Sequence, residues 1–109
     1  MTVQELIDIQ LFQLKNAGDD LERDITVPFC CDLLSVAMGQ APSGSAWVTI
    51  MSNLNTLAVA SLADVACVIL AEGVELDGAV KETANAKGIN ILTAHMPAYE
   101  TAMALASRL

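Results

Sequence analysis

The stretch Ser45 to Gly73 reads SAWVTIMSNLNTLAVASLADVACVILAEG, and it decides the fold. Residues 46–51 form a nearly continuous apolar run, which is typical of a buried strand, and a second such run ends at Glu72-Gly73. Between the two runs, apolar residues recur at helical spacing. The residues predicted to face inward on this helix are Leu54, Leu57, Ala58, Ser61, Leu62 and Val65. A strand, helix and strand in this order predict a right-handed crossover in a parallel sheet.

The segments before this unit predict one helix, two strands and a second helix. Thr2-Val3-Gln4-Glu5 matches a capping box and predicts a helix over residues 3–10, followed by a short strand over 11–15. Residues 25–31 are rich in strand formers, and Pro28 indicates an edge strand or a break in the ladder. Asp32 is a natural N-cap for a second helix, which Gly39 should end. The residues predicted to face the core on this helix are Leu33, Leu34, Ala37 and Met38.

The segments after the unit predict a helix, a strand and a final helix. Asp77 caps a helix that Gly88 ends, residues 89–93 form a strand, and Pro97 opens the last helix. The predicted inner residues are Val80, Thr83, Ala84 and Lys87 on the first of these helices, and Tyr99, Ala102, Met103 and Ala106 on the last. The chain is therefore expected to form one α/β domain over residues 1–109, a three-layer α/β/α arrangement with a mostly parallel sheet of about five strands.

Composition limits the classes of function. The chain has 109 residues, a net charge of −8 and only five basic residues, so nucleic acid and anionic membranes should be repelled. No apolar run approaches the roughly 20 residues of a membrane span, and the first residues lack the features of a signal peptide, which predicts a cytoplasmic protein. The high apolar content indicates either apolar surface covered by another subunit or a well-filled core.

Cysteines and motifs give no sign of a cofactor or a metal. Cys30, Cys31 and Cys67 form no CxxC pair and no even disulfide framework, so they are expected to be reduced and mostly buried. Adjacent strand residues point to opposite faces, so Cys30 and Cys31 should not bind one ion together. No glycine-rich phosphate loop occurs. The acidic residues around Arg23 lack the spacing of a calcium loop and are expected to be a solvated surface.

Polar residues follow the predicted strands at their carboxyl ends, where open parallel sheets bind ligands. The residues predicted to converge there are Asp32, Ser52, Asn53, Asn55, Glu72 and His95. None of the five basic residues is among them, so a neutral or weakly charged ligand is easier to accept than a polyphosphate. Alternatively, Asn53 or Asn55 is only a helix cap, and Glu72 is only an exposed carboxylate. His95 is either structural or a base beside Asp32 or a cysteine.

Several segments resemble the DRTGG domain family. The segments that carry the resemblance are Cys31-Asp32-Leu33-Leu34-Ser35 with Met38, Trp47-Val48-Thr49-Ile50, Asn55, Val59-Ala60 and Val68-Ile69-Leu70-Ala71-Glu72-Gly73. The namesake string itself is missing; Arg23-Asp24-Ile25-Thr26 stands at the corresponding place, with Val27 where glycine is usual. The family is similar to the N-terminal domain of HPr kinase, and it also occurs beside CBS modules.

The resemblance implies a noncatalytic α/β domain. Together with the acidic composition and the absence of catalytic motifs, it leads to the first hypothesis, a regulatory or ligand-sensing domain that works as a homodimer, with no cofactor or metal expected. Its ligand would be a small metabolite or a partner peptide at the carboxyl ends of the strands. A second hypothesis is an assembly protein of a redox complex, because stand-alone members similar to this chain are found beside genes for iron hydrogenases. A third is a small hydrolase that uses His95 with Asp32 or a cysteine.

Overall fold

The computed structural model describes all 109 residues and contains five helices and five strands. In chain order the elements are α1 (Val3–Asp8), β1 (Gln13–Asn16), β2 (Pro28–Cys30), α2 (Leu34–Gln40), β3 (Ala46–Thr49), α3 (Leu54–Ala63), β4 (Cys67–Leu70), α4 (Gly78–Lys87), β5 (Ile91–Thr93) and α5 (Ala98–Ala106). The predicted number, order and type of elements are confirmed. None of the five helices has the length and apolar character of a membrane span.

All five strands form one sheet in the order β1-β5-β4-β3-β2. Strands β2 to β5 run parallel, and β1 pairs antiparallel with β5. The mostly parallel sheet is thus confirmed. β3 and β4 each have a neighbouring strand on both sides, and every residue of both strands is buried, which explains their mostly apolar sequences. Pro28 begins β2 at the open edge of the sheet, where its missing N–H costs no ladder hydrogen bond.

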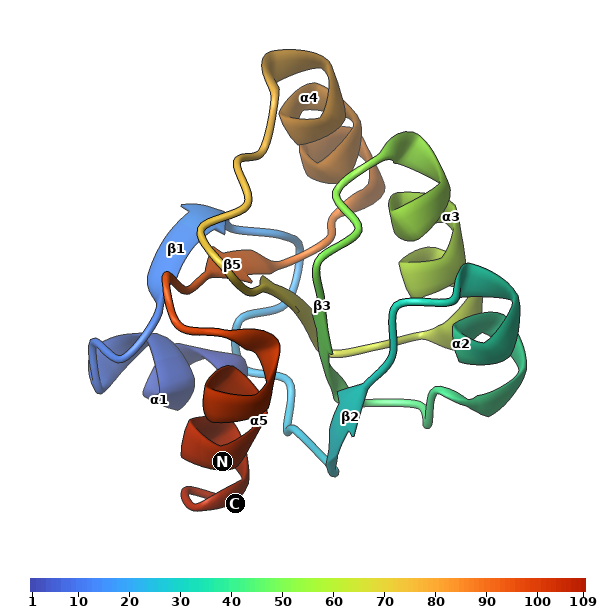
Figure 1. Ribbon diagram of the computed structural model, residues 1–109. Helices are drawn as coiled ribbons and strands as arrows, with labels where there is room; N and C mark the ends of the chain where they lie inside the picture. The colour runs from blue at the N-terminus through green and yellow to red at the C-terminus, as the bar shows by residue number, and fades with distance from the viewer.

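Helices cover both faces of the sheet, as Figure 1 shows, with α2, α3 and α4 on one side and α1 and α5 on the other. Each face has its own core. Trp47 and Leu57 belong to the cluster under α2, α3 and α4, whereas Val48 and Leu105 belong to the cluster under α1 and α5. Because adjacent strand residues point to opposite faces, β3 contributes to both clusters. The three-layer α/β/α fold is confirmed.

Local capping signals predicted three helix starts correctly. The Thr2 hydroxyl accepts from the Glu5 N–H at 3.1 Å, and the Glu5 carboxylate accepts from the Thr2 N–H at 2.9 Å, which completes the capping box. Asn53 caps α3, and Asp77 caps α4 through the Val80 N–H. Gly88 ends α4 with a φ of 70°, a left-handed conformation that glycine adopts without strain. Such motifs are local, so they depend little on the rest of the fold.

The predicted inner faces of α2 and α3 are largely wrong. On α3 only Leu57 of the predicted set is buried, whereas Leu54 is 53 % and Leu62 is 74 % exposed. The buried residues of α3 are Thr56, Leu57, Val59 and Ala60. On α2 only Ala37 is buried, and Gly39 lies inside the helix rather than after it. Both helices carry apolar residues on every side, so packing on the sheet selects the buried side and the spacing does not.

Helix α5 also packs with a different side from the predicted one. Thr101 and Leu105 are buried, but Tyr99 is 73 % and Met103 is 54 % exposed. The Thr101 hydroxyl donates to the Met96 carbonyl at 3.2 Å, so this polar side chain can be buried with its hydrogen bond made. Leu105 is thus the one large side chain of α5 that enters the core, whereas Tyr99 and Met103 remain on the surface.

Candidate functional site

The six predicted site residues all lie at the crest, defined as the edge of the sheet at the carboxyl ends of β2 to β5, but the structure does not bring them together. Asp32 follows β2, whereas His95 follows β5. Because β3 and β4 lie between these strands, three strand spacings, roughly 14 Å, separate the two ends. Cys30 and Cys31 lie at the β2 end as well. This separation does not support the alternative in which His95 acts as a base beside Asp32 or a cysteine.

Asp32 links the loop after β2 to the end of β3. Its Oδ1 accepts from the Thr49 hydroxyl and from the Ile50 N–H, both at 3.0 Å. The predicted capping role is wrong, since α2 begins after Leu33 and has no side-chain cap. The carboxylate is used instead to hold two crest loops together.

A broad cleft of about 630 Å³ lies between the start of α3 and the start of α4. Ser52, Asn53 and Asn55 line it on the α3 side, and Asp77 lines it on the α4 side. The Asn53 side chain accepts from the Thr56 N–H at 3.1 Å, which confirms the alternative interpretation of Asn53 as a helix cap. Asp77 caps α4 in the same way. The cleft thus lies between two helix starts that are already capped.

The loops after β4 and β5 lead to opposite faces of the sheet, because β4 continues to α4 and β5 continues to α5. This divergence makes the β4/β5 boundary the switch point of the parallel part of the sheet, the place where such folds form a ligand crevice. Glu72 adopts a left-handed φ of 61° there. Its N–H donates to the Met96 carbonyl at 2.8 Å, and its carboxylate accepts from the Ala98 N–H at 3.4 Å. Glu72 thereby joins the two loops and meets the start of α5.

His95 lines a pocket of about 140 Å³ beside this switch point, together with Lys15, Gly73 and Glu75. A neighbouring hollow of about 450 Å³ shares four lining residues with it, His95 included. Lys15 is there because β1 runs antiparallel beside β5. The expectation that no basic residue lies at the crest is therefore wrong. A sequence does not show which strand β1 joins, so this cation was missed.

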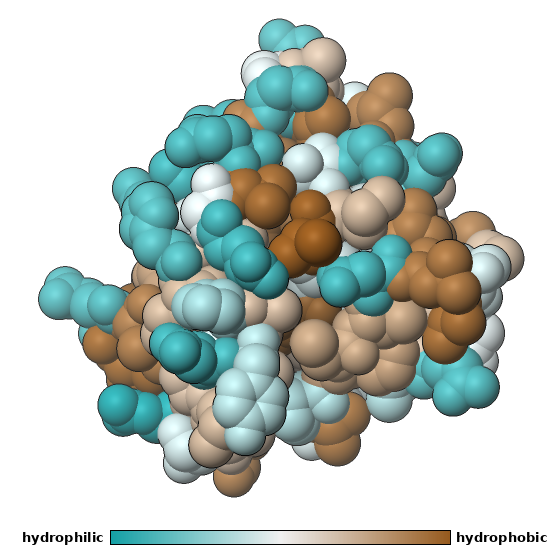
Figure 2. Space-filling model, in the orientation of Figure 1, coloured by the Kyte–Doolittle hydropathy of each residue, from teal (hydrophilic) through white to brown (hydrophobic).

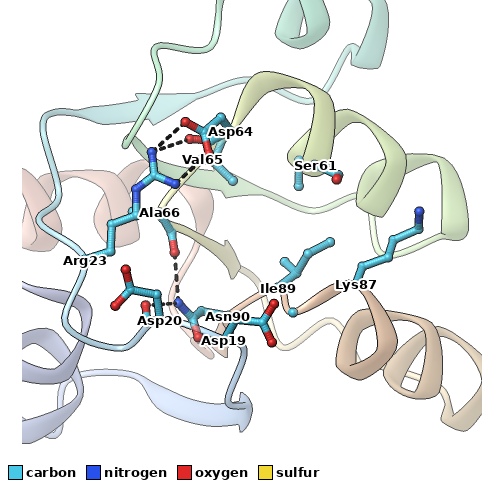
Figure 3. Close-up of a pocket in the computed structure, with 12 residues that line it drawn as sticks. Asp19, Asp20, Arg23, Ser61, Asp64, Val65, Ala66, Lys87, Ile89 and Asn90 are labelled. Atoms are coloured by element: carbon cyan, nitrogen blue, oxygen red, sulfur yellow. Dashed lines mark hydrogen bonds and ion pairs between the residues drawn. The ribbon is translucent and has the colours of Figure 1, made fainter.

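An ion pair that the sequence did not predict lies at the other end of the sheet from the crest, near the amino end of β4 (Figure 3). Asp64 accepts from Arg23 through both carboxylate oxygens; the second contact, to Nη2, measures 2.8 Å. The Ser43 hydroxyl donates to the same carboxylate at 2.7 Å. These donors hold the pKa of Asp64 well below its ordinary value, and the Asp64 carboxylate raises the pKa of Arg23. Arg23 thus pairs with the end of α3 rather than with its acidic neighbours in sequence.

Asn90 lines a pocket of about 220 Å³ together with Arg23 and Asp64 (Figure 3). Its amide donates to the Asp20 carbonyl at 3.0 Å and to the Ala66 carbonyl at 3.1 Å, and it accepts from the Gly18 N–H at 2.7 Å. Asn90 is only 4 % exposed. The side chains of Asn90, Arg23 and Asp64 already make hydrogen bonds within the protein, and these bonds hold the 18–24 loop in place. Few of their polar atoms are therefore free to bind a ligand.

The Asp64→Asn variant tests the ion pair, since asparagine tolerates the left-handed φ of 60° at this position. We expect it to lower the free energy of unfolding at pH 7 by about 1 kcal/mol, the upper range for an exposed pair. Because the pKa of folded Asp64 lies below that in the unfolded chain, its stabilisation is complete above about pH 5 and is lost as the pH falls. Urea unfolding from pH 7 to pH 2 should show the difference from wild type narrowing below about pH 4. Glu82→Gln on α4 is the control. A difference in the free energy of unfolding between Asp64→Asn and wild type that stays the same from pH 7 to pH 2 would contradict the prediction.

Two of the three cysteine thiols, those of Cys30 and Cys67, have raised pKa values. Partial burial and the nearby Asp32 carboxylate raise the pKa of Cys30, and burial raises the pKa of Cys67 to about 12. Both thiols stay protonated near neutral pH, whereas a reactive cysteine needs a lowered pKa. Cys67 is buried as expected, but Cys30 is exposed.

The comparisons with known proteins match the chain to no family model and to no curated protein. No group of three or more His, Cys, Asp or Glu side chains is placed to hold a metal ion. The fold and the geometry of the crest are therefore the observations on which a function is argued.

Proposed function

We propose that this chain is a cytoplasmic, noncatalytic regulatory domain that works as a homodimer and binds a small carboxylate-bearing metabolite in the pocket of His95 and Lys15. The observation that carries the proposal is the position of this pocket at the β4/β5 switch point, with a cation beside it. The predicted ligand site thus moves from the Ser52–Asn55 loop toward Glu72 and His95.

The lining of the pocket favours a ligand with one negative charge. Lys15 supplies an ammonium group for a carboxylate, but Glu75 lines the same pocket and the chain carries a net charge of −8. A polyphosphate would meet too little positive charge here. A Cβ at Gly73 would lie 3.4 Å from His95 Nδ1, so the glycine leaves the imidazole uncovered. A metabolite would extend from the 140 Å³ pocket into the 450 Å³ hollow, since ligand sites usually measure about 300–1,000 Å³.

The residues around the pocket also support a role without catalysis. Nucleophilic catalysis needs a nucleophile within hydrogen-bond reach of a base. His95 is separated by two strands from Asp32 and from the exposed cysteine Cys30. The pKa of the Cys30 thiol is raised rather than lowered. Binding therefore fits this arrangement better than hydrolysis.

Thermal unfolding against a panel of small carboxylates, amino acids, acyl metabolites and nucleotides tests the proposal. A ligand at 100 times its Kd stabilises the native state by about 2.7 kcal/mol, which raises the Tm of a domain of this size by about 10 °C. We expect such a shift with a small carboxylate and none with nucleotides. A flat response across the panel would exclude the sensing function.

The Lys15→Met variant locates the site, because it removes the charge and retains most of the apolar stem. We expect it to abolish the shift produced by the carboxylate. Lys81→Met, on the exposed side of α4, is the matched control and should respond like wild type. An undiminished shift in Lys15→Met would place the ligand elsewhere.

An assembly role is the second candidate, and exposed apolar residues near α3 favour it. Ile50, Leu54 and Leu62 are 38 %, 53 % and 74 % exposed. Such residues are enriched where another protein binds. Co-purification from the host separates the two functions when the tagged wild-type chain is compared with Leu54→Ser, which removes one apolar side chain from this surface. A stoichiometric partner lost in Leu54→Ser, together with a flat ligand panel, would favour the assembly role.

A further inference from the structure

A shallow apolar groove of about 290 Å³ runs between the edge strand β2 and helix α5. Its lining residues include Cys30, Tyr99 and Met103, and none of them is charged. Tyr99 is 73 % and Met103 is 54 % exposed. The chain carries a net charge of −8, so an exposed groove without charged residues differs from most of its surface. Exposed apolar patches of this kind mark sites where another molecule binds.

The groove belongs to a larger apolar edge. Six of the ten exposed large apolar residues lie beside β2 or on the two helices at this end of the sheet, α2 and α5. They are Val27, Leu33, Val36, Met38, Tyr99 and Met103. The two helices cover opposite faces, so apolar side chains lie on both sides of the strand. Figure 2 shows tan and brown surface over the region of β2 and α2, and teal surface over the region of β1.

The backbone of β2 is open for pairing on its outer side. Val27 accepts from the Ala46 N–H at 2.9 Å, and the Cys31 N–H donates to the Val48 carbonyl at 3.2 Å, so residues 27 and 31 face β3. Alternation turns the backbone groups of Pro28 and Cys30 away from the sheet. Because proline has no N–H, the Cys30 N–H is the outward donor of β2, and the Pro28 and Cys30 carbonyls are its acceptors.

We infer that a second copy of this chain pairs with β2 in antiparallel direction, around a two-fold axis at Cys30, so that one sheet runs through both copies. In this register each Cys30 N–H donates to the partner's Cys30 carbonyl, and the missing N–H of Pro28 does not affect the central pair. The inference rests on the proposed homodimer and adds its surface and register.

Charge and area favour a second copy as the occupant. Two copies that each carry −8 repel one another over most of their surface, but not across an uncharged face. The two-fold axis sets the α5 helices side by side in opposite directions, which brings the Glu100 end of one toward the Arg108 end of its partner. A stable dimer buries about 800 Å² per partner. A three-residue strand is too small for that, so the exposed side chains of α2 and α5 supply the remainder.

Sedimentation over a range of protein concentrations tests the surface with two matched variants. Met103→Glu puts a carboxylate into the groove, and Leu62→Glu puts one on an equally apolar, exposed position of α3. We expect wild type and Leu62→Glu to be dimers, and the dimer Kd of Met103→Glu to rise about 100-fold, because two unpaired charges would be buried. Circular dichroism should show that Met103→Glu keeps its fold.

The outcomes separate this inference from the proposed homodimer. A wild-type chain that stays monomeric at every concentration would overturn both. A dimer that persists in Met103→Glu would overturn the β2 surface alone and leave the homodimer standing.

Thiol cross-linking tests the register on the folded wild-type chain. The two Cys30 Cα atoms should lie about 5.5 Å apart across the axis. A short bis-maleimide should therefore yield a covalent dimer in Cys31→Ser, whose other thiol is the buried Cys67, and none in the double variant Cys30→Ser/Cys31→Ser. Failure of Cys31→Ser to cross-link while it sediments as a dimer would overturn the register.

Discussion

Replacing Trp47 with alanine is expected to lower the free energy of unfolding by about 4 kcal/mol. Trp47 lies on the interior strand β3, is fully buried, and fills the core under α2, α3 and α4. Removing the indole leaves a large cavity that the surrounding helices cannot close completely. Urea unfolding should show the loss, which is a large share of the roughly 5–15 kcal/mol that stabilises a domain.

The Trp47→Phe variant separates the two contributions of Trp47 to the free energy of unfolding, the packing of its ring and its hydrogen bond. The indole Nε1–H donates to the Cys31 carbonyl at 2.8 Å, and this bond holds the loop after β2 against β3. Phenylalanine keeps most of the buried ring but leaves that carbonyl without its donor, so a loss of about 1–2 kcal/mol is expected. If Trp47→Ala and Trp47→Phe lose the same amount, packing is not the main contribution of this side chain.

Gly18→Ala is expected to destabilise the chain by about 3 kcal/mol, although the change adds a single methyl group. A Cβ at Gly18 would lie 2.6 Å from the Gly88 carbonyl carbon and 2.8 Å from that of Ile89, and closer still to the Gly88 oxygen. All three atoms are backbone, so no side chain can rotate away. The 18–24 loop would have to move away from the end of α4, which would break the Asp19 N–H bond to Gly88.

Gly39→Ala is the matched control for this prediction. Gly39 lies within α2, and a Cβ there would meet no atom within 4 Å. Because glycine weakens a helix, this substitution should stabilise the chain by about 0.5–1 kcal/mol. Thermal unfolding of the two variants should therefore move in opposite directions. Equal effects would mean that the close approach at Gly18 is not a tight constraint.

The capping box at Thr2, the Asn53 cap and the Asp77 cap could be predicted because each motif is complete within four residues. The apolar runs that became β3 and β4 were equally readable, since a central strand is buried on both faces. The crossover that joins them followed from the handedness of such connections. These features carried the fold prediction.

The candidate site was predicted only in part. Asp32, Glu72 and His95 were placed correctly at strand ends, but the partner of each came from a distant segment. Lys15 reaches the pocket of His95 because β1 pairs with the side of β5 that faces away from β4. Lys15 and Thr93, which both line this pocket, are 78 positions apart in the sequence. The pair of Arg23 and Asp64 is likewise formed by residues 41 positions apart.

The stretch Ser45 to Gly73 determined by itself that the chain forms an α/β fold, because its apolar runs and the helix between them can be buried only in a layered sheet. Only the tertiary structure decided which sides of α3 and α5 face the core, since both helices are apolar on several sides and the sheet selects among them. That selection left Tyr99 and Met103 on the surface beside β2. The switch point was decided in the same way, because the face that each helix covers depends on contacts between elements far apart in the chain.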